Sequence, residues 1–454
     1  MSFAITSISP IDGRYSRQTE SLKPVFSEFG LIKNRVKVEI LWLIALSNDK
    51  EIKELPKFSK NSLKFLDQLF LDFSEKDAKA VKEIESKTNH DVKAVEYWLR
   101  NQLKKKKLNK ANEFIHFSLT SEDVNNLAYA LMLKEGLSET IVPSIKKISS
   151  ILKANSKKFA SLPMLSRTHG QTASPTTLGK EFANINYRIE RQITQLKNQE
   201  ILGKINGAVG NYNAHISAYP KKNWPAFSKN FISSLKLTYN PLTTQIEPHD
   251  FIAEIFQNVS RINTILIDLN RDIWGYISLG YFKQKVIKGE IGSSTMPHKV
   301  NPIDFENSEG NLGLSNAILS HLAEKLPLSR WQRDLTDSTV LRNIGVGFSY
   351  GLIAYNSCIK GLNKLEVNKS IIHEELNQSW EVLAEPIQTV MRKNGIENSY
   401  EKLKDITRGK GKISADKIHH FIKNLKISRE DKTYLLELTP QTYIGVAPQL
   451  AKKN

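Results

Sequence analysis

The sequence predicts an all-α protein whose centre is a bundle of long helices. Residues 252–273 carry apolar side chains at intervals of three and four, which places them on one narrow seam of a helix. Residues 182–196 repeat this spacing. No convincing run of alternating polar and apolar residues, the pattern of a half-buried strand, occurs along the chain. The apolar residues of the longer seam are Ile252, Ile255, Val259, Ile262, Leu266, Leu269 and Ile273. These seams favour helix packed on helix.

Further helices are expected on both sides of these seams. One should begin behind Thr120 and Ser121, because both residue types cap helices and apolar residues follow at helical spacing. Residues 143–160 and 340–362 also have a helical pattern. The second of these contains Gly345, Gly347 and Gly351. Glycine weakens a helix intrinsically but lets a neighbouring helix approach closely.

The length of 454 residues exceeds what one core usually spans, so we expect two or three domains, and the helical pattern divides the chain into three. Residues 1–112 mix short helices with polar turns, and residues 113–364 hold the central bundle. Residues 365–454 are expected to form a smaller helical domain.

Composition indicates a soluble, cytoplasmic protein. Hydrophobic residues make up 40% and charged residues 25% of the chain, which is ordinary for a globular protein. The single cysteine, Cys358, excludes an intramolecular disulfide and a cysteine cluster for zinc. We expect no membrane association, because no stretch reaches the roughly 20 apolar residues of a membrane span. The N-terminus also lacks the apolar core of a signal peptide.

The chain is strongly basic, with a formal net charge of +18. This charge attracts polyanions or steers a phosphorylated substrate, or it reflects a lysine-rich, solvated surface, which we favour. The lysine run at 104–107 has no interleaved aromatic residues on which bases could stack. We therefore expect no specific nucleic-acid partner, although charge alone gives sequence-independent binding at low salt.

Residues 290–307 are the most informative segment for function. Gly292 frees the backbone, Ser293 and Ser294 offer hydroxyls and amides, and two prolines prevent a continuous helix. Lys299 adds one fixed cation. Such a loop suits an anionic substrate whose charge grows during the reaction. The alternative is an ordinary surface loop, since loops are commonly built from glycine, serine and proline.

The order of these residues resembles the signature loop of the fumarase/aspartase superfamily. The matching run at 292–301 reads Gly-Ser-Ser-Thr-Met-Pro-His-Lys-Val-Asn. Neighbouring segments narrow the resemblance to the adenylosuccinate lyase family in its longer bacterial form. The resemblance extends along the chain from residues 9–15 to residues 440–445. The resemblance implies a three-part helical fold and a homotetramer whose central helices join into a twenty-helix core.

The implied reaction releases fumarate from a succinyl group on a purine-pathway nitrogen. The implied substrates are adenylosuccinate, which gives AMP, and succinylaminoimidazole-carboxamide ribotide, which gives the carboxamide ribotide. A base removes a proton from the carbon beside a carboxylate, and fixed donors must stabilise the dianion that results. An acid then protonates the departing nitrogen.

The resemblance assigns the proton transfers to particular residues. Ser293 is the implied general base, and it needs nearby amides and Lys299 to stabilise its alkoxide once the loop closes. His169, in the segment Thr-His-Gly-Gln, is the implied general acid, since its reference pKa of about 6.5 allows donation at neutral pH. Glu306 is implied to pair with this histidine and orient it. His90 either contacts the substrate or assists proton transfer.

The resemblance also implies a larger set of residues that bind the substrate. Ser294, Lys299 and Asn301 would hold the substrate carboxylate. Arginine forks suit phosphate and carboxylate geometry. Residues 88–91 and the pair at 120–121 could equally be helix caps, and a helix N-terminus also binds anions. The full set is Arg14, Tyr15, Asn89, His90, Asp91, Thr120, Ser121, Gln245, Ser294, Lys299, Val300, Asn301, Asn307, Arg333, Ser338, Thr339, Val340, Leu341 and Arg342.

Other enzyme classes lack their motifs. The sequence has no Gly-x-x-x-x-Gly-Lys-Ser/Thr loop, no Gly-x-Gly-x-x-Gly after a strand, no His-Glu-x-x-His and no Gly-x-Ser-x-Gly. We expect no metal and no cofactor. Two alternatives stay open: another fumarate-releasing lyase such as argininosuccinate lyase, or an inactive, basic helical scaffold that binds nucleic acid. We expect active sites shared between subunits, because the motifs lie on helices and loops far apart in the sequence.

Overall fold

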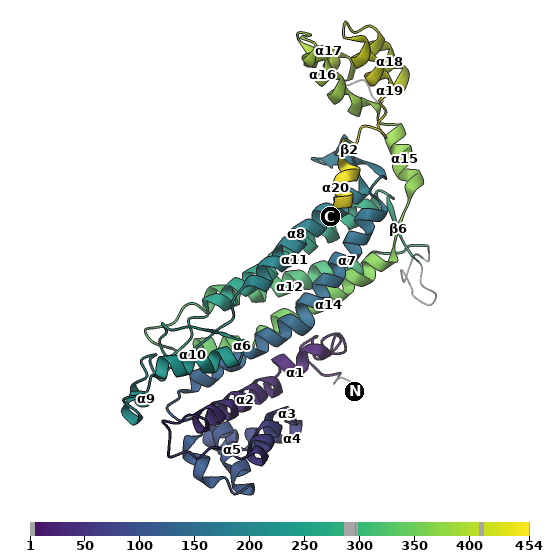
Figure 1. The fold of residues 1–454 in the computed structure, drawn as a ribbon. Helices are drawn as coiled ribbons and strands as arrows, with labels where there is room; N and C mark the ends of the chain where they lie inside the picture. Colours follow the sequence, from purple (N-terminus) through teal and green to yellow (C-terminus); the bar gives the residue numbers. More distant parts are fainter. Residues whose placement is uncertain (1–4, 286–295, 297, 408–412, 454) are drawn as a thin grey trace. The chain divides into compact units, whose positions relative to one another are not determined.

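The computed structural model describes residues 5–285, 296, 298–407 and 413–453. Helices dominate these residues, which confirms the all-α prediction (Figure 1). The chain divides into two compact units. Unit 1 comprises the described parts of residues 1–145, 192–264 and 310–356, and unit 2 those of 146–191, 265–309 and 357–454.

The longest helices include the predicted ones. They are α2 (Glu28–Ser47), α6 (Ser121–Gly136), α7 (Val142–Lys158), α8 (Leu178–Asn198), α11 (Asp250–Ser278), α12 (Ile303–Lys325) and α14 (Ile344–Lys364). The shorter helices are α1 (Lys23–Phe26), α3 (Lys60–Leu71), α4 (Glu75–Thr88), α5 (Asp91–Lys105), α9 (Asn213–Ala218), α10 (Trp224–Ser234), α13 (Thr336–Leu341), α15 (Lys369–Asn377), α16 (Ala384–Lys393), α17 (Ser399–Thr407), α18 (Ala415–Lys423), α19 (Arg429–Glu437) and α20 (Ala447–Lys453). Short 3₁₀ helices cover Glu20–Leu22, Asn109–Phe114 and Trp380–Leu383, and a π-helical turn covers Leu137–Ile141.

The apolar seam predicted for residues 252–273 lies on α11. Ile252, Val259 and Ile262 are all buried, as the spacing requires. Helices α7, α8, α11, α12 and α14 each have residues in both units. The predicted division into residues 1–112, 113–364 and 365–454 therefore does not coincide with the two units, and it stays a prediction.

Within the described residues, six short strands pair two by two, and the sequence did not predict them. They are β1 (Pro163–Thr168) with β2 (Gln171–Thr177), β3 (Leu202–Gly203) with β4 (Thr238–Tyr239), and β5 (Phe282–Gln284) with β6 (Leu365–Val367). Strands β1 and β2 form a substantial antiparallel hairpin. Its strands are buried at the base and exposed toward the tip, so their polarity changes along the strand instead of alternating. This is why a search for alternation missed them.

Close helix packing in unit 1 depends on glycines of α14, as predicted. A Cβ atom at Gly345 would lie 2.6 Å from Cβ of Phe26 on α1. One at Gly347 would lie 2.9 Å from Cδ2 of Leu319 on α12. Both distances are shorter than side-chain contacts allow, so these backbones approach only because the side chains are absent.

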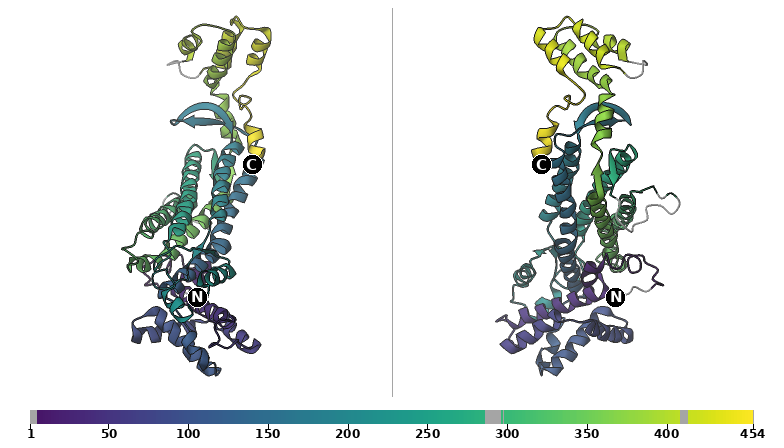
Figure 2. Two further views of the ribbon diagram at one scale, coloured as in Figure 1. Left: turned by 60° about the vertical axis from the view of Figure 1, so that its left-hand side comes forward. Right: turned by 90° about the vertical axis from the view of Figure 1, so that its right-hand side faces the viewer.

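Unit 1 also contains α2, α3, α4 and α5, which pack side by side (Figure 1). In unit 2 the C-terminal helices α16–α19 form one group, drawn in green to yellow in Figure 2. Ile387, Met391, Ile418 and Leu435 are buried within it. Within the described parts of the chain, no helix combines the length and the apolar character that crossing a membrane requires.

Candidate functional site

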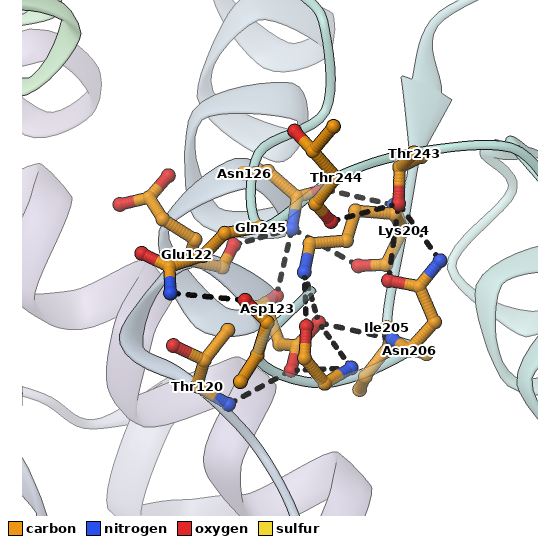
Figure 3. A network of polar contacts seen from close by, with 12 residues as sticks. Thr120, Glu122, Asp123, Asn126, Lys204, Ile205, Asn206, Thr243, Thr244 and Gln245 are labelled. Atoms are coloured by element: carbon orange, nitrogen blue, oxygen red, sulfur yellow. Dashed lines mark hydrogen bonds and ion pairs between the residues drawn. The ribbon is translucent and has the colours of Figure 1, made fainter. Parts of the chain in front are cut away.

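A buried ion pair fixes the start of α6 in unit 1. Asp123 and Lys204 are completely buried, and Nζ of the lysine lies 2.9 Å from Oδ1 of the carboxylate (Figure 3). Asp123 also accepts hydrogen bonds from the backbone N–H groups of Thr120 (2.8 Å), Asn206 (3.0 Å) and Gly207 (3.1 Å). One carboxylate therefore holds the helix start against residues 204–207. The network therefore also holds in place Thr120 and Ser121, the substrate-binding pair expected at the start of α6.

The same network reaches the segment around Gln245 (Figure 3). The amide of Asn206 donates to Oγ1 of Thr243 over 2.8 Å. Gln245 donates from Nε2 to the carbonyl of Ala208 (3.0 Å) and accepts at Oε1 from Arg333 Nη1 (3.2 Å). The structure thus brings Gln245 and Arg333, two residues named from the sequence, into contact.

Arg333 is also held by carboxylates. Its Nη2 lies 2.9 Å from Oε1 of Glu122 and 3.9 Å from Oδ1 of Asp337. Burial raises the pKa of Glu122, and the charge of Arg333 opposes that rise. Asp337 accepts at 2.6 Å from the backbone N–H of Ser338, the first residue of the predicted segment 338–342.

In segment 338–342 only some side chains are available to a ligand. Thr339 and Arg342 are exposed, whereas Leu341 is buried.

Residues 88–91 form the junction between α4 and α5, as the capping alternative predicted. Asn89 ends α4 in the left-handed conformation, with φ 51°. His90 is the N-cap of α5, and its Nδ1 accepts from the backbone N–H of Lys93 over 3.2 Å. This bond places the proton of a neutral His90 on Nε2. Capping and substrate binding are compatible here, because the histidine side chain is half exposed.

Asp91 lies between two arginines. Its Oδ2 is 2.7 Å from Nη2 of Arg35 and 3.0 Å from Nη2 of Arg342. Burial alone would raise the pKa of Asp91, but the charges of both arginines and the N–H of Val92 bring it below its usual value. Arg342 also pairs with Glu28 over 2.8 Å. Two segments predicted to bind substrate, at 89–91 and 338–342, thus meet in unit 1.

The first predicted segment lies near a cavity in unit 1. The guanidinium of Arg14 is exposed and 6.0 Å from the ring centroid of Tyr15. A cavity of about 250 Å³ is lined by Ser9, Asp12 and Arg342, among others. Arg342 therefore faces a hollow bounded by the chain segment that carries the Arg-Tyr pair.

His169 occupies the tip of the β1–β2 hairpin in unit 2. Thr168 pairs with Gln171, which leaves His169 and Gly170 as a two-residue turn. Both have positive φ, at 54° and 75°, as a type I′ turn requires. The histidine is exposed. A short hairpin thus presents the imidazole away from the body of its strands.

The expected pairing of His169 with Glu306 stays a prediction. Among the described residues of unit 2, no hydrogen bond or ion pair joins them. Glu306 lies in the first turn of α12 and accepts at Oε1 from Trp274 Nε1 over 3.1 Å. The next residue, Asn307, accepts from Ser357 Oγ over 2.7 Å.

The signature loop is only partly described. Ser293 and Ser294, the predicted base and carboxylate-binding residue, lie outside the described residues. Lys299 and Val300 are exposed, and Asn301 is half-buried. The cation predicted to stabilise growing negative charge is therefore accessible.

Sequence reasoning missed several residues that support this site. They are Arg35, Glu122, Asp123, Asn125 and Lys204. The spacing of Thr120 and Asp123 is that of a capping box, which could have identified the aspartate. The others carry no local signal, because their partners lie far away in the sequence. Across the described part of the chain, no group of three or more His, Cys, Asp or Glu side chains is arranged to hold a metal ion.

Two family models together match most of the chain. A model described as a lyase matches residues 13–317. A model described as the adenylosuccinate lyase C-terminal domain matches residues 329–444.

Several proteins named adenylosuccinate lyase are similar over nearly their whole length. The Vibrio cholerae protein is 58% identical over 452 residues, which cover 99% of each chain. The protein of Escherichia coli strain K12 is 58% identical over 98% of this chain and 97% of its own. That of Buchnera aphidicola subsp. Schizaphis graminum is 59% identical over 98% of each.

Solved structures share the fold at low sequence identity. A fumarate lyase from Mesorhizobium sp. BNC1 has a TM-score of 0.76 at 17% identity and covers 96% of this chain and 97% of its own. The 3-carboxy-cis,cis-muconate lactonizing enzyme of Pseudomonas putida has a TM-score of 0.73 at 19% identity, covering 96% of each chain. The fold, the matched models and the full-length relatives agree: the chain belongs to the adenylosuccinate lyase family.

Proposed function

We propose that this protein releases fumarate from adenylosuccinate, giving AMP, and from succinylaminoimidazole-carboxamide ribotide, giving the carboxamide ribotide. The observation that carries the proposal is the 58% identity to an adenylosuccinate lyase over 99% of both chains. The C-terminal match at residues 329–444 includes Arg333 and segment 338–342, which favours a nucleotide substrate over argininosuccinate.

The proposed chemistry is an elimination with separate base and acid. Ser293 takes the proton from the carbon beside a substrate carboxylate, and that carboxylate gains a second negative charge. The carbon–nitrogen bond then breaks, and its electron pair remains on the nitrogen. His169 delivers a proton to this nitrogen, so the products are fumarate and the amine. The exposed position of His169 on a hairpin tip suits this donation.

The anionic groups of the substrate need fixed positive partners. Lys299, Ser294 and Asn301 are proposed to hold the carboxylate that gains charge. Arg14, Arg333 and Arg342 are proposed to bind the phosphate and the second carboxylate, because a guanidinium offers paired donors. The remaining contacts are assigned to Tyr15, Asn89, His90, Asp91, Thr120, Ser121, Gln245, Val300, Asn307, Ser338, Thr339, Val340 and Leu341.

The protein is further proposed to act as a homotetramer with shared active sites. Large apolar side chains are exposed on α8, α11 and α12, and a subunit interface formed by these helices would bury them. They are Tyr187, Trp274, Ile303 and Leu314. In the described residues Glu306 bonds to Trp274 and not to His169, which also fits a site that a second subunit completes. The twenty-helix core implied by the sequence belongs to this proposal.

The test is an assay of the purified protein on two succinyl-containing substrates. Adenylosuccinate and argininosuccinate are supplied separately, and fumarate is measured. We expect fumarate from adenylosuccinate alone. Turnover of argininosuccinate without turnover of adenylosuccinate would contradict the proposal and would indicate the other lyase.

A further inference from the structure

Arg342 and Arg333, two of the three arginines proposed to bind substrate, are each paired with a carboxylate that has a second, more buried partner. Asp91 accepts from Arg342 at 3.0 Å and from Arg35 at 2.7 Å. The two arginines differ in access, since the side chain of Arg342 is 37% exposed and that of Arg35 only 1% exposed. Only Arg342 can therefore turn toward a ligand, while Arg35 stays with the carboxylate.

The second arginine shows the same arrangement. Glu122 pairs with Arg333 at 2.9 Å and accepts from Nδ2 of Asn125 at 2.7 Å. Asn125 is buried, and its Oδ1 accepts from Nε of Arg35 at 2.8 Å.

A continuous chain of contacts thus connects Arg342, through Asp91, Arg35, Asn125 and Glu122, to Arg333. All six residues belong to unit 1, and Glu122 is drawn beside Gln245 in Figure 3.

The other carboxylates near these arginines are also shared. Glu28 faces Arg342 and lies 3.4 Å from Nζ of Lys82. Asp337 faces Arg333, lies 3.6 Å from Nε2 of His249, and accepts the backbone N–H of Ser338. No carboxylate among these four depends on the substrate-binding arginine alone.

This arrangement has a consequence for binding. A buried carboxylate that loses its only partner incurs a large desolvation penalty. An anionic substrate that attracts Arg333 or Arg342 would impose this penalty on the buried Glu122, and a smaller one on the half-buried Asp91, if no other donor were present. Arg35 and Asn125 provide that donor in advance, so each arginine can move to the substrate while its carboxylate stays paired.

We infer that Arg35 and Asn125 are positioning residues that allow Arg342 and Arg333 to exchange a protein carboxylate for the anionic groups of a nucleotide substrate. This inference rests on the proposed function. Neither residue touches the substrate in this account. Their removal should weaken substrate and product binding much more than it slows the chemical step, because the acid and base are elsewhere.

The variants are Arg35→Met, Arg35→Lys and Asn125→Asp. Arg35→Met removes the buried charge, and Arg35→Lys retains it with fewer donors. Asn125→Asp keeps the shape but replaces the amide that donates to Glu122 with a second acid. For each, we measure kcat and KM for fumarate release from adenylosuccinate, the calorimetric Kd for AMP, and Tm.

We expect KM and the AMP Kd to rise about 10-fold or more in Arg35→Met and Asn125→Asp, with kcat changed by less than about 3-fold. Arg35→Lys should lie between wild type and Arg35→Met. The matched control is Lys222→Met, which breaks another buried ion pair of unit 1, with Asp49. It should lower Tm and leave KM and the AMP Kd within about 2-fold of wild type.

A purely structural role predicts a different result. If Arg35→Lys and Asn125→Asp lower Tm while KM and the AMP Kd stay within about 2-fold of wild type, the inference is wrong. If Arg35→Met does not fold, the KM and AMP Kd values of Arg35→Lys and Asn125→Asp still test the inference. If the wild-type protein binds AMP but releases no fumarate, the proposed function is wrong. The inference is then tested by comparing the AMP Kd values of the variants with that of the wild type. A wild-type protein that binds neither AMP nor adenylosuccinate contradicts both.

Discussion

At the scale of single residues, the proposed proton transfers depend on one hydroxyl and one imidazole. We predict that Ser293→Ala and His169→Ala each reduce kcat by at least ~10²-fold, the usual effect of losing an acid or base. Circular dichroism and Tm should be unchanged. His420→Ala, which removes an exposed histidine of α18, is the control and should retain full activity. Near-normal turnover in either Ser293→Ala or His169→Ala would refute the role of that residue.

A second residue-scale prediction concerns His215. This side chain is fully buried against Trp42, Tyr212 and Trp224. Burial lowers its pKa to about 4, from an ordinary value of 6.5. The unfolded chain therefore binds a proton between these pH values and the folded chain does not. The titration of His215 should therefore lower the stability of the wild type by roughly 3 kcal/mol as the pH drops from 6.5 to 4, in addition to the effects of other titrating groups.

The variant His215→Phe tests this pH dependence by denaturant unfolding at several pH values. Because phenylalanine does not titrate, the variant should lose less stability than the wild type between pH 6.5 and 4. His420→Phe, an exposed substitution, should follow the wild-type profile. Parallel profiles for His215→Phe and the wild type would show that His215 does not control this pH dependence.

At the scale of elements, the hairpin tip should matter for catalysis. Gly170 has φ 75°, a conformation that costs an alanine roughly 1 kcal/mol. We predict that Gly170→Ala lowers kcat on the order of 10-fold or more, because a displaced turn would move His169. Gly395→Ala is a matched control, since its φ is 69° and both sites have open space for a methyl group. The control should lose similar stability but keep its kcat. Equal kcat in the two variants would contradict the role of the hairpin.

The elements differ in how far the sequence could predict them. The helix α11 was predictable because its seven-residue seam repeats over the whole length. The start of α6 was predictable because Thr120 caps it. The hairpin β1–β2 was not, since its burial changes from base to tip. His169 was named from its motif, but its place on a turn followed only from strand pairing.

The candidate site also contains some residues that the sequence could identify and others that it could not. Arg333, Arg342 and Asp91 were named from motifs, and the structure places Arg342 beside Asp91. Their supports, Arg35 and Asn125, lie in helices whose local pattern predicts only packing. A buried arginine can be recognised only when its partner from a distant segment is known, and that information resides in the tertiary structure.

At the scale of the whole molecule, we predict that the exposed apolar face of α12 holds subunits together. Leu314→Arg should dissociate a tetramer of 51.6 kDa chains and abolish most activity, because the site would be incomplete in a monomer. Analytical ultracentrifugation and the fumarate assay measure both effects. Leu71→Arg, on α3 with a side chain exposed to a similar degree, is the control. A monomeric Leu314→Arg variant with full activity would argue against shared sites.

The central claim is that the intact protein splits adenylosuccinate into AMP and fumarate without added cofactor. The most direct test follows both products by chromatography during a single incubation of purified protein with adenylosuccinate. We expect AMP and fumarate to appear together in a one-to-one ratio, and we expect the Ser293→Ala variant to form neither at a comparable rate. Absence of both products from the wild-type reaction, with the protein folded, would contradict it.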